Sequence, residues 1–294
     1  MIRAEDIIAI PKSSNQYPEA LKTLSDAPET LYAVGDIRLL NTSLFTMVGS
    51  RKTATAALQW CAQTAKELSE KFTLVTGVAE GGDGAVTEGA LAGSGKIICV
   101  LAGGFGSIPQ GNFQVLQKIA KHGLLLSPHE YGVPVRNFSY EYRNKLLARL
   151  GEGTLVVSAG EKSGTLITAK WARKFEKPVF ALPYFPSSAT GVGCNALLKT
   201  GAILTESATD IFEYYNLTER TVDESATVRA LEEQLSDNEL RVYRALSAEN
   251  DLHANAIAEK SGLPVFKIRA ILTALEVKGF VTALGGNHYA VTKK

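Results

Sequence analysis

The sequence predicts an α/β protein in which a doubly wound parallel sheet is followed by a small C-terminal domain. Two observations predict this class: short apolar runs alternate with longer amphipathic stretches through the middle of the chain, and the alternation stops near residue 215. The apolar runs are continuous, as in strands that helices bury on both faces. With 294 residues, the chain is long enough for one large core and a second, smaller one.

Seven apolar runs have the length and composition of buried strands. They lie at 44–48, 72–76, 96–101, 123–127, 154–158, 177–182 and 201–204. The amphipathic stretches that separate most of them predict helices at about 54–71, 83–93, 112–122, 139–150, 164–176 and 207–215. Because strands and helices alternate as in βαβ units, residues 40–215 are expected to form one Rossmann-like core with an open parallel sheet.

Residues on either side of this core complete the predicted organisation. Residues 1–39 are expected to be a lead-in that packs on the core, with a short helix, a turn at Asp26-Ala27-Pro28 and a strand-like LYAVG. Residues 216–233 carry five acidic and two basic side chains and no apolar cluster, which is typical of a solvated linker.

Residues 234–294 predict a winged-helix domain, because three helical stretches precede a two-stranded hairpin with Gly285-Gly286 at its turn. Ser236 and Glu239 form a capping-box pattern at the first helix, and Pro264 is expected at the first position of the third.

The overall composition is that of a globular protein, with 45% hydrophobic and 21% charged residues. The N-terminus lacks the features of a secretory signal and no apolar run could cross a bilayer, so we expect a cytoplasmic location and no membrane partner. Three scattered cysteines and four histidines show no ligand spacing, which predicts reduced thiols and no metal. A net charge of +1 excludes a uniformly basic coat for nucleic acid but leaves room for a local basic pocket.

In an open parallel sheet, ligands bind where the carboxyl ends of strands lead into helices. The loop VGSRKT at 48–53 offers amides, hydroxyls and two cations to an anion, although it could also be a tight turn with a solvated Arg51. The loop AGEKSGTLIT at 159–168 offers amides and hydroxyls at another helix start. Arg143 and Lys145 lie early in a helix, where they oppose the helix dipole, and this favours a ligand role for both.

Two further loops are rich in glycine. In TGVAEGGDG at 76–84, Asp83 is a candidate helix cap, and Glu80 would repel a phosphate. In GGFGSIP at 103–109, Phe105 could stack on a base or fill the core. None of the loops contains a GxSxG elbow, a P-loop, paired carboxylates with a proton-transfer partner or an intact dinucleotide fingerprint. We therefore expect a binding surface with no catalytic residue and no cofactor, and not an enzyme.

The ordered series of motifs resembles the DNA-processing protein A (DprA/Smf) family over essentially the whole chain. The matching segments are YP…L…DAPETLYAVGD at 17–36, VGSR at 48–51, TGVAEGGD at 76–83, YRNKLLARL at 142–150, SGTLITAKWA at 163–172, PVFALP at 178–183, GCNALLKTGA at 193–202 and the C-terminal winged helix. The resemblance implies a core that forms a homodimer and binds and protects single-stranded DNA. It also implies loading of the RecA recombinase onto that DNA in natural transformation and homologous recombination.

The resemblance also implies site residues. Arg51 matches the basic residue of the family's GSR loop, and Arg143 and Lys145 match those of its RNR segment. The expected DNA-binding residues, from loops and resemblance together, are Gly49, Ser50, Arg51, Lys52, Gly77, Gly81, Phe105, Arg143, Asn144, Lys145, Ser163, Gly164, Thr165, Thr168, Lys170 and Asn195. The chain departs from the family's glycine loop at Glu80 (usually basic), Gly82 (isoleucine) and Thr87 (histidine), and Lys145 replaces an arginine, which leaves open whether DNA binding survives these changes.

Two other functions remain open at this point. GGFGS at 103–107 is a fragment of the PGGxGTxxE motif of nucleotide-cleaving Rossmann-like proteins, so nucleotide binding or cleavage is one alternative. A winged-helix regulator of duplex DNA is the other. The helix expected at 264–278 offers Lys267, Arg269 and Lys278 against Glu276, and this weak field favours protein contacts over duplex binding.

Overall fold

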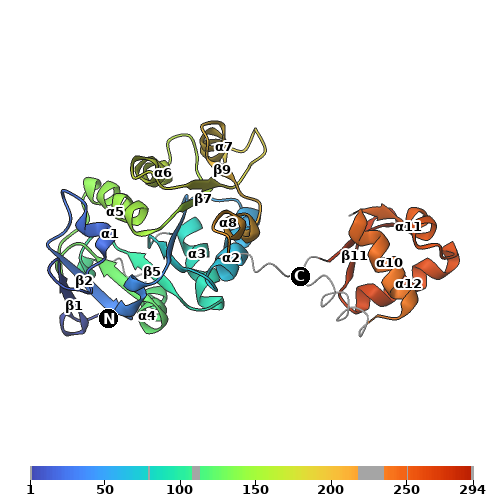
Figure 1. Cartoon of the computed structure of the whole chain (residues 1–294), viewed down its shortest axis with the longest axis horizontal. Helices are drawn as coiled ribbons and strands as arrows, with labels where there is room; N and C mark the ends of the chain where they lie inside the picture. The colour runs from blue at the N-terminus through green and yellow to red at the C-terminus, as the bar shows by residue number, and fades with distance from the viewer. Residues whose placement is uncertain (1, 79, 108–112, 218–234, 250, 293–294) are drawn as a thin grey trace. The chain divides into compact units, whose positions relative to one another are not determined.

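The computed structural model of the chain describes residues 2–78, 80–107, 113–217, 235–249 and 251–292. The chain divides into two compact units, Met1–Leu217 and Thr218–Lys294 (Figure 1). Most of the predicted linker at 216–233 lies outside the described residues.

The first unit contains a nine-stranded sheet with the order β1-β2-β6-β5-β4-β3-β7-β8-β9. The strands are β1 (Ile8–Pro11), β2 (Thr30–Gly35), β3 (Leu44–Gly49), β4 (Thr73–Thr76), β5 (Ile97–Val100), β6 (Leu124–Ser127), β7 (Thr154–Ser158), β8 (Val179–Ala181) and β9 (Ile203–Leu204). Strands β3 to β9 all run parallel to one another, which confirms the predicted α/β class. The strand order reverses between β3 and β7, so a crevice is expected at the carboxyl ends of these two strands.

The lead-in predicted at residues 1–39 adds an antiparallel edge to the sheet. Strand β2 pairs antiparallel with β6, and β1 pairs antiparallel with β2, so the first 39 residues extend the sheet by two strands. The reason is the short connection from β2 to β3 through the 3-10 helix η2 (Ile37–Asn41). A strand that feeds β3 over so few residues must end at the edge where β3 begins, and it therefore runs opposite to β3.

Helices cover both faces of the sheet. One face carries α1 (Glu19–Lys22), α5 (Asn137–Leu150), α6 (Thr165–Lys174) and α7 (Val192–Lys199). The other carries α2 (Thr55–Leu68), α3 (Gly82–Ala92), α4 (Phe113–His122) and α8 (Ala208–Tyr214), while η1 (Ala4–Asp6) and η3 (Phe105–Ser107) are single 3-10 turns.

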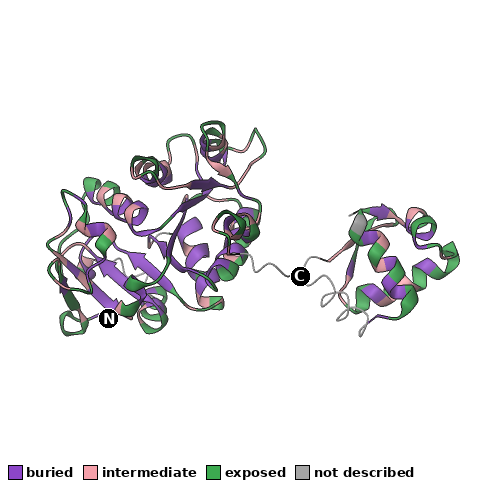
Figure 2. Ribbon diagram, in the orientation of Figure 1, coloured by how far each residue is buried: buried purple, intermediate pink, exposed green. Residues whose placement is uncertain are grey.

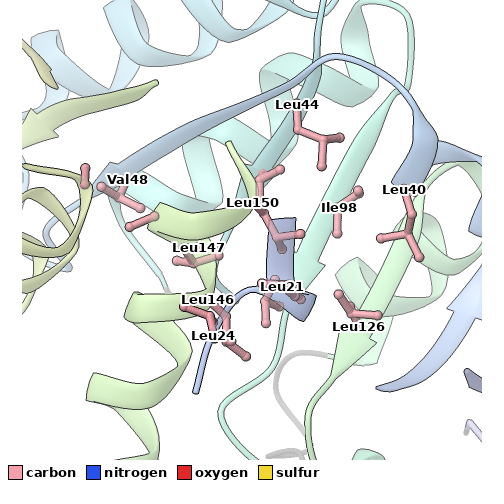
Figure 3. Packing of buried hydrophobic residues seen from close by; sticks show 14 of the residues in the cluster. Leu21, Leu24, Leu40, Leu44, Val48, Ile98, Leu126, Leu146, Leu147 and Leu150 are labelled. Atoms are coloured by element: carbon pink, nitrogen blue, oxygen red, sulfur yellow. The ribbon is translucent and has the colours of Figure 1, made fainter. Parts of the chain in front are cut away.

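The strand residues divide between two hydrophobic clusters because successive side chains point to opposite faces of a strand. Val48 and Val156 belong to the first cluster, and Met47 and Leu155 belong to the second. Figure 3 shows leucines of α5 packed over the strands of the first cluster. The central strands are accordingly buried throughout, and exposed residues gather on the outer helix surfaces (Figure 2).

The second unit has the order of a winged helix. It contains α10 (Asp237–Ala248), β10 (Leu252–His253), α11 (Ala254–Ser261), α12 (Val265–Val277), β11 (Val281–Gly285) and β12 (His288–Val291), with a sheet of order β10-β12-β11. The predicted capping box is confirmed, since the Glu239 carboxylate accepts a hydrogen bond from the Ser236 amide at 2.8 Å. Pro264 is the N-cap of α12, whereas the sequence predicted it at the first position within the helix.

None of the helices in the described parts of the chain has both the length and the apolar character that a membrane span requires.

We expect Leu126→Ala to lower the free energy of unfolding of the first unit by about 3 kcal/mol, because Leu126 is fully buried in the first cluster. Both tryptophans, Trp60 and Trp171, lie in this unit, so urea denaturation followed by tryptophan fluorescence reports on it alone. Leu204→Ala is the matched control, since Leu204 is 51% exposed and its loss should cost less than about 0.5 kcal/mol. Equal losses for the two variants would contradict the described core.

Candidate functional site

A pocket of about 400 Å³ lies at the switch point between β3 and β7. Three segments line it: the loop that follows β3, one face of α5, and the start of α6. Ten of the predicted DNA-binding residues meet here, namely Gly49, Ser50, Arg51, Lys52, Arg143, Asn144, Ser163, Gly164, Thr165 and Thr168. The structure thus brings together the loop at 48–53, the helix that carries Arg143 and the loop at 159–168.

The loop after β3 is held in place by its neighbours. The Ser50 amide donates to the Ser158 carbonyl at the end of β7 (3.0 Å), and the Ser50 carbonyl accepts from Gly82 (3.0 Å). Gly49 and Gly82 approach so closely that a Cβ on Gly49 would lie 2.7 Å from the Gly82 Cα. Two glycines are therefore required where this loop meets α3, and Gly82 fits this contact.

The side chains of Arg51 and Lys52 are exposed at the mouth of the pocket. The Arg51 guanidinium lies 5.7 Å from the centre of the Tyr140 ring, within the range of a cation–π contact. Within the described segments, neither cation forms a salt bridge. The loop therefore presents two positive charges to whatever enters the pocket.

Arg143 lies at the floor of the pocket and is only 8% exposed. Its Nη1 donates to the Val100 carbonyl at the end of β5 (3.2 Å), and its Nε donates to Asn144 Oδ1 (2.9 Å). Asp83, 5% exposed, accepts from the Gly49 amide (3.2 Å). A Cβ on Gly77 would overlap both Arg143 and Asp83, so these two side chains converge directly above that glycine.

Burial raises the pKa of the Asp83 carboxyl, and the charge of Arg143 opposes this shift. Burial likewise lowers the pKa of the Arg143 guanidinium against the attraction of Asp83. Each charge thus favours the charged form of the other, although no salt bridge joins the two side chains among the described residues; Asp83 bonds the end of β3, and Arg143 bonds the end of β5. Asp83 does not cap α3 as the sequence suggested, because Gly81 holds the N-cap position and the Asp83 carboxylate reaches Gly49 instead.

The start of α6 offers hydrogen-bonding groups. The Asn144 amide donates to the Gly164 carbonyl (3.2 Å), and the Ser163 hydroxyl donates to Thr165 Oγ1 (3.1 Å). Thr168 is 1% exposed, and its hydroxyl has no hydrogen-bond partner among the residues described. The backbone amides at the start of α6 can donate hydrogen bonds to an anion in the pocket, and Thr168 is part of the lining at that point.

Three predicted site residues have other roles. Phe105 is 2% exposed and packs in the second cluster because η3 turns its ring inward, so the expected stacking on a base is wrong for this conformation. Lys145 pairs with Asp26 (2.5 Å) and lies 4.8 Å from the centre of the Trp171 ring, away from the pocket. The Asn195 side chain bonds the amide and the carbonyl of Tyr184 (3.0 and 2.9 Å).

The remaining predicted residues surround the pocket without lining it. Gly77 lies beneath Arg143, Gly81 packs against the backbone of Ser50 and Arg51, and Lys170 is exposed further along α6. Glu80 lines a separate hollow of about 450 Å³ between α2, α3 and α4. The carboxylate expected to repel phosphate therefore lies outside the basic pocket.

Two polar residues that line the pocket, Asp83 and Tyr140, were not among the predicted site residues, and neither were the apolar Val48 and Leu147. Tyr140 lies three positions before Arg143 and so shares its helix face, a spacing that could have identified it. No group of three or more metal-ligating side chains gathers anywhere in the described residues.

We expect Arg143→Met to lower the free energy of unfolding by about 3 kcal/mol, because it leaves the buried Asp83 carboxylate without its countercharge. Without Arg143, the pKa of Asp83 is raised further. The loss of unfolding free energy should therefore shrink as the pH falls from 8 to 5, because protonation of Asp83 removes the uncompensated charge. Urea denaturation measures both effects. The double variant with Asp83→Asn should recover at least half of the loss, and Arg51→Met, at an exposed site, should lose less than about 0.5 kcal/mol. A pH-independent deficit would contradict this account of the pair.

Comparison with known proteins identifies the family. Residues 8–216 match the family described as DNA recombination-mediator protein A, and residues 226–287 match the DprA winged helix domain. The chain is 38% identical over 223 residues to the DNA processing protein DprA of Bacillus subtilis, covering 75% of this chain and 74% of that protein.

Two solved structures share the fold. DNA processing protein A from Streptococcus pneumoniae is similar with a TM-score of 0.68 and 29% identity, over 71% of this chain and 74% of that one. DNA processing protein A from Helicobacter pylori, described for its single-stranded DNA binding mode, is similar with a TM-score of 0.65 and 30% identity. The similarity covers 73% of this chain and 98% of that one. The core and the winged helix together show that the chain belongs to the DNA-processing protein A (DprA/Smf) family.

Proposed function

We propose that this chain binds single-stranded DNA in the pocket between β3 and β7. The observation that carries the proposal is the meeting of Arg51 and Lys52, two cations without a salt bridge among the described residues, with the start of α6, where the Thr168 hydroxyl has no hydrogen-bond partner in the same set of residues. Cations, amides and hydroxyls are the groups that contact phosphate in nucleic-acid complexes. The single-stranded DNA binding described for the relative from Helicobacter pylori supports the same ligand.

The groups that line the pocket have different roles in binding. Arg51 and Lys52 neutralise the sugar–phosphate backbone at the mouth, while the first turn of α6 donates hydrogen bonds further in. Two of the five N–H donors of Arg143 bond the Val100 carbonyl and Asn144 Oδ1, so this side chain supports the loops that hold the exposed cations, and its other donors are left for a phosphate. Contacts of this kind are made to phosphates, so we infer binding with little preference for base sequence.

The family and the pocket support a wider role, which we propose with it. The protein acts as a homodimer in the cytoplasm, protects incoming DNA, and loads the RecA recombinase onto it during natural transformation and homologous recombination. Binding and handover of a strand require no bond to be made or broken, so the proposed function is not enzymatic.

The size of the pocket supports one alternative ligand. A volume of about 400 Å³ lies within the range of small-molecule sites, and a mononucleotide carries the same phosphate. Competition between dTMP and oligo-dT separates the two functions. If dTMP saturates the pocket at micromolar concentration, the nucleotide is the ligand; if only longer strands bind tightly, the proposed function holds.

We expect Arg51→Ala to weaken the binding of oligo-dT about fivefold near 0.15 M salt, because it removes one phosphate contact. The slope of log K against log salt should fall by about 0.7. Fluorescence anisotropy over a salt series measures both. The control is Arg38→Ala, which removes the same charge from the opposite edge of the sheet, where the Arg38 side chain is 88% exposed. Equal effects of the two substitutions would indicate a general charge effect and refute the pocket.

We expect Thr168→Val to weaken oligo-dT binding about tenfold and to leave the stability of the free protein unchanged or slightly raised. The hydroxyl donates nothing in the free protein, and a hydrogen bond to phosphate is charge-assisted. Thr154→Val is the matched control, because the Thr154 hydroxyl is also buried without a partner but lies at the amino end of β7. Anisotropy and urea denaturation of both variants test this, and unchanged binding of the Thr168 variant would contradict it.

A further inference from the structure

The helix α12 of the second unit presents an apolar stripe to solvent. In winged-helix domains the helix at this position commonly contacts DNA, and its outward face is then polar and basic. Here Phe266 is 78% exposed and Val277 is 84% exposed, and Ala270 and Thr273 lie exposed between them. Successive spacings of four, three and four residues place all four side chains in one row along the helix.

This row is not used by the fold of its own unit. The opposite face of α12 supplies Ile268, Leu272 and Leu275, which are fully buried in the core of the second unit. The Thr273 hydroxyl donates to the Arg269 carbonyl at 3.0 Å. Thr273 can therefore be buried in an interface with its hydroxyl already hydrogen-bonded and its methyl group in contact with a partner. The stripe can therefore be covered without leaving a polar group unsatisfied.

Two opposite charges flank the stripe on the same side. Arg269 and Glu276 are seven residues apart, about 10 Å along the helix, which is too far for them to pair within one chain. Neither forms a salt bridge in the described part of the chain; the only hydrogen bond to the Glu276 carboxylate there comes from the Ala283 amide, at 3.4 Å. The stripe thus carries a positive charge near its start and a negative charge near its end.

We propose that α12 pairs antiparallel with α12 of a second copy of this chain. A two-fold axis between residues 270 and 273 places Phe266 opposite Val277 and Ala270 opposite Thr273. The same axis brings Arg269 of each copy beside Glu276 of the other, so the interface is complementary to itself in shape and in charge. The small residues at its centre let the two helices approach closely. This pairing does not depend on which ligand the pocket of the first unit binds.

The area buried when two α12 helices pair is that of one short helix pair, well below the roughly 1,200 Å² of a stable interface. The contact is therefore weak between free molecules and becomes populated when copies are held near one another, where the effective concentration is high. Self-pairing of this kind would connect neighbouring copies through their second units.

Disulfide trapping with the full chain tests the pairing. Two single variants, Ala270→Cys and Thr273→Cys, are purified separately, mixed, and oxidised mildly; the native cysteines Cys61, Cys99 and Cys194 are buried and do not interfere. The antiparallel register predicts that the mixture forms a mixed dimer at least about threefold faster than either variant forms a dimer alone. Equal rates in the mixture and in the separate variants would overturn the register.

A charge exchange in the same assay separates self-pairing from DNA binding. Arg269→Glu and Glu276→Arg should each slow trapping about threefold or more, because like charges then face each other, and the double variant should regain the original rate. A DNA-binding helix would instead lose DNA affinity in the first variant and gain it in the second, with trapping unchanged, and that result would overturn the proposal.

Phe266→Ser should abolish trapping, while Val265→Ser, a neighbouring exposed valine outside the stripe, should not. Circular dichroism checks that both variants remain helical. Equal trapping by the two serine variants in folded protein would likewise overturn the proposal.

Discussion

The buried pair of Arg143 and Asp83 is the interaction on which the candidate site depends. Asp83 fixes the amide of Gly49 at the end of β3, and Arg143 bonds the carbonyl of Val100 at the end of β5. Gly77, at the end of β4, leaves the space in which the two charges meet. Arg143 also orients Asn144, which bonds the Gly164 carbonyl at the start of α6. One pair of charges thus sets the positions of four segments that form or support the pocket.

In this arrangement, the residues that support the pocket differ from the exposed cations at its mouth. The buried Arg143 guanidinium uses two of its five N–H donors within the protein, whereas Arg51 and Lys52 are exposed on a loop that backbone hydrogen bonds support. The positive charge at the mouth is therefore preorganised, which lowers the cost of ordering side chains when a strand binds. Lys145 shows the opposite outcome, because its charge is compensated by Asp26 and its stem is covered by Trp171.

Much of this could be predicted from the sequence, for physical reasons. Continuous apolar runs identify strands buried on both faces, and the loops at their carboxyl ends then share one edge, so ten of the predicted residues meet at one pocket. The predictions that were wrong concern the direction in which a side chain points and the residue that it contacts. Residue spacing does not reveal that the ring of Phe105 turns inward, or that Lys145 meets a carboxylate 119 positions away. The antiparallel β2 likewise depends on the length of its connection to β3, which the apolar pattern does not encode.

The proposed function requires single-stranded DNA to occupy the pocket at the switch point of the sheet. Photocrosslinking of an oligo-dT that contains 4-thiothymidine, followed by mass spectrometry of the full chain, locates the bound strand. If the strand lies in the pocket, crosslinks form on peptides that include residues 49–53 and 163–168, and those signals are lost in the Arg51→Ala variant. Crosslinks confined to the second unit, or to the hollow lined by Glu80, would contradict it.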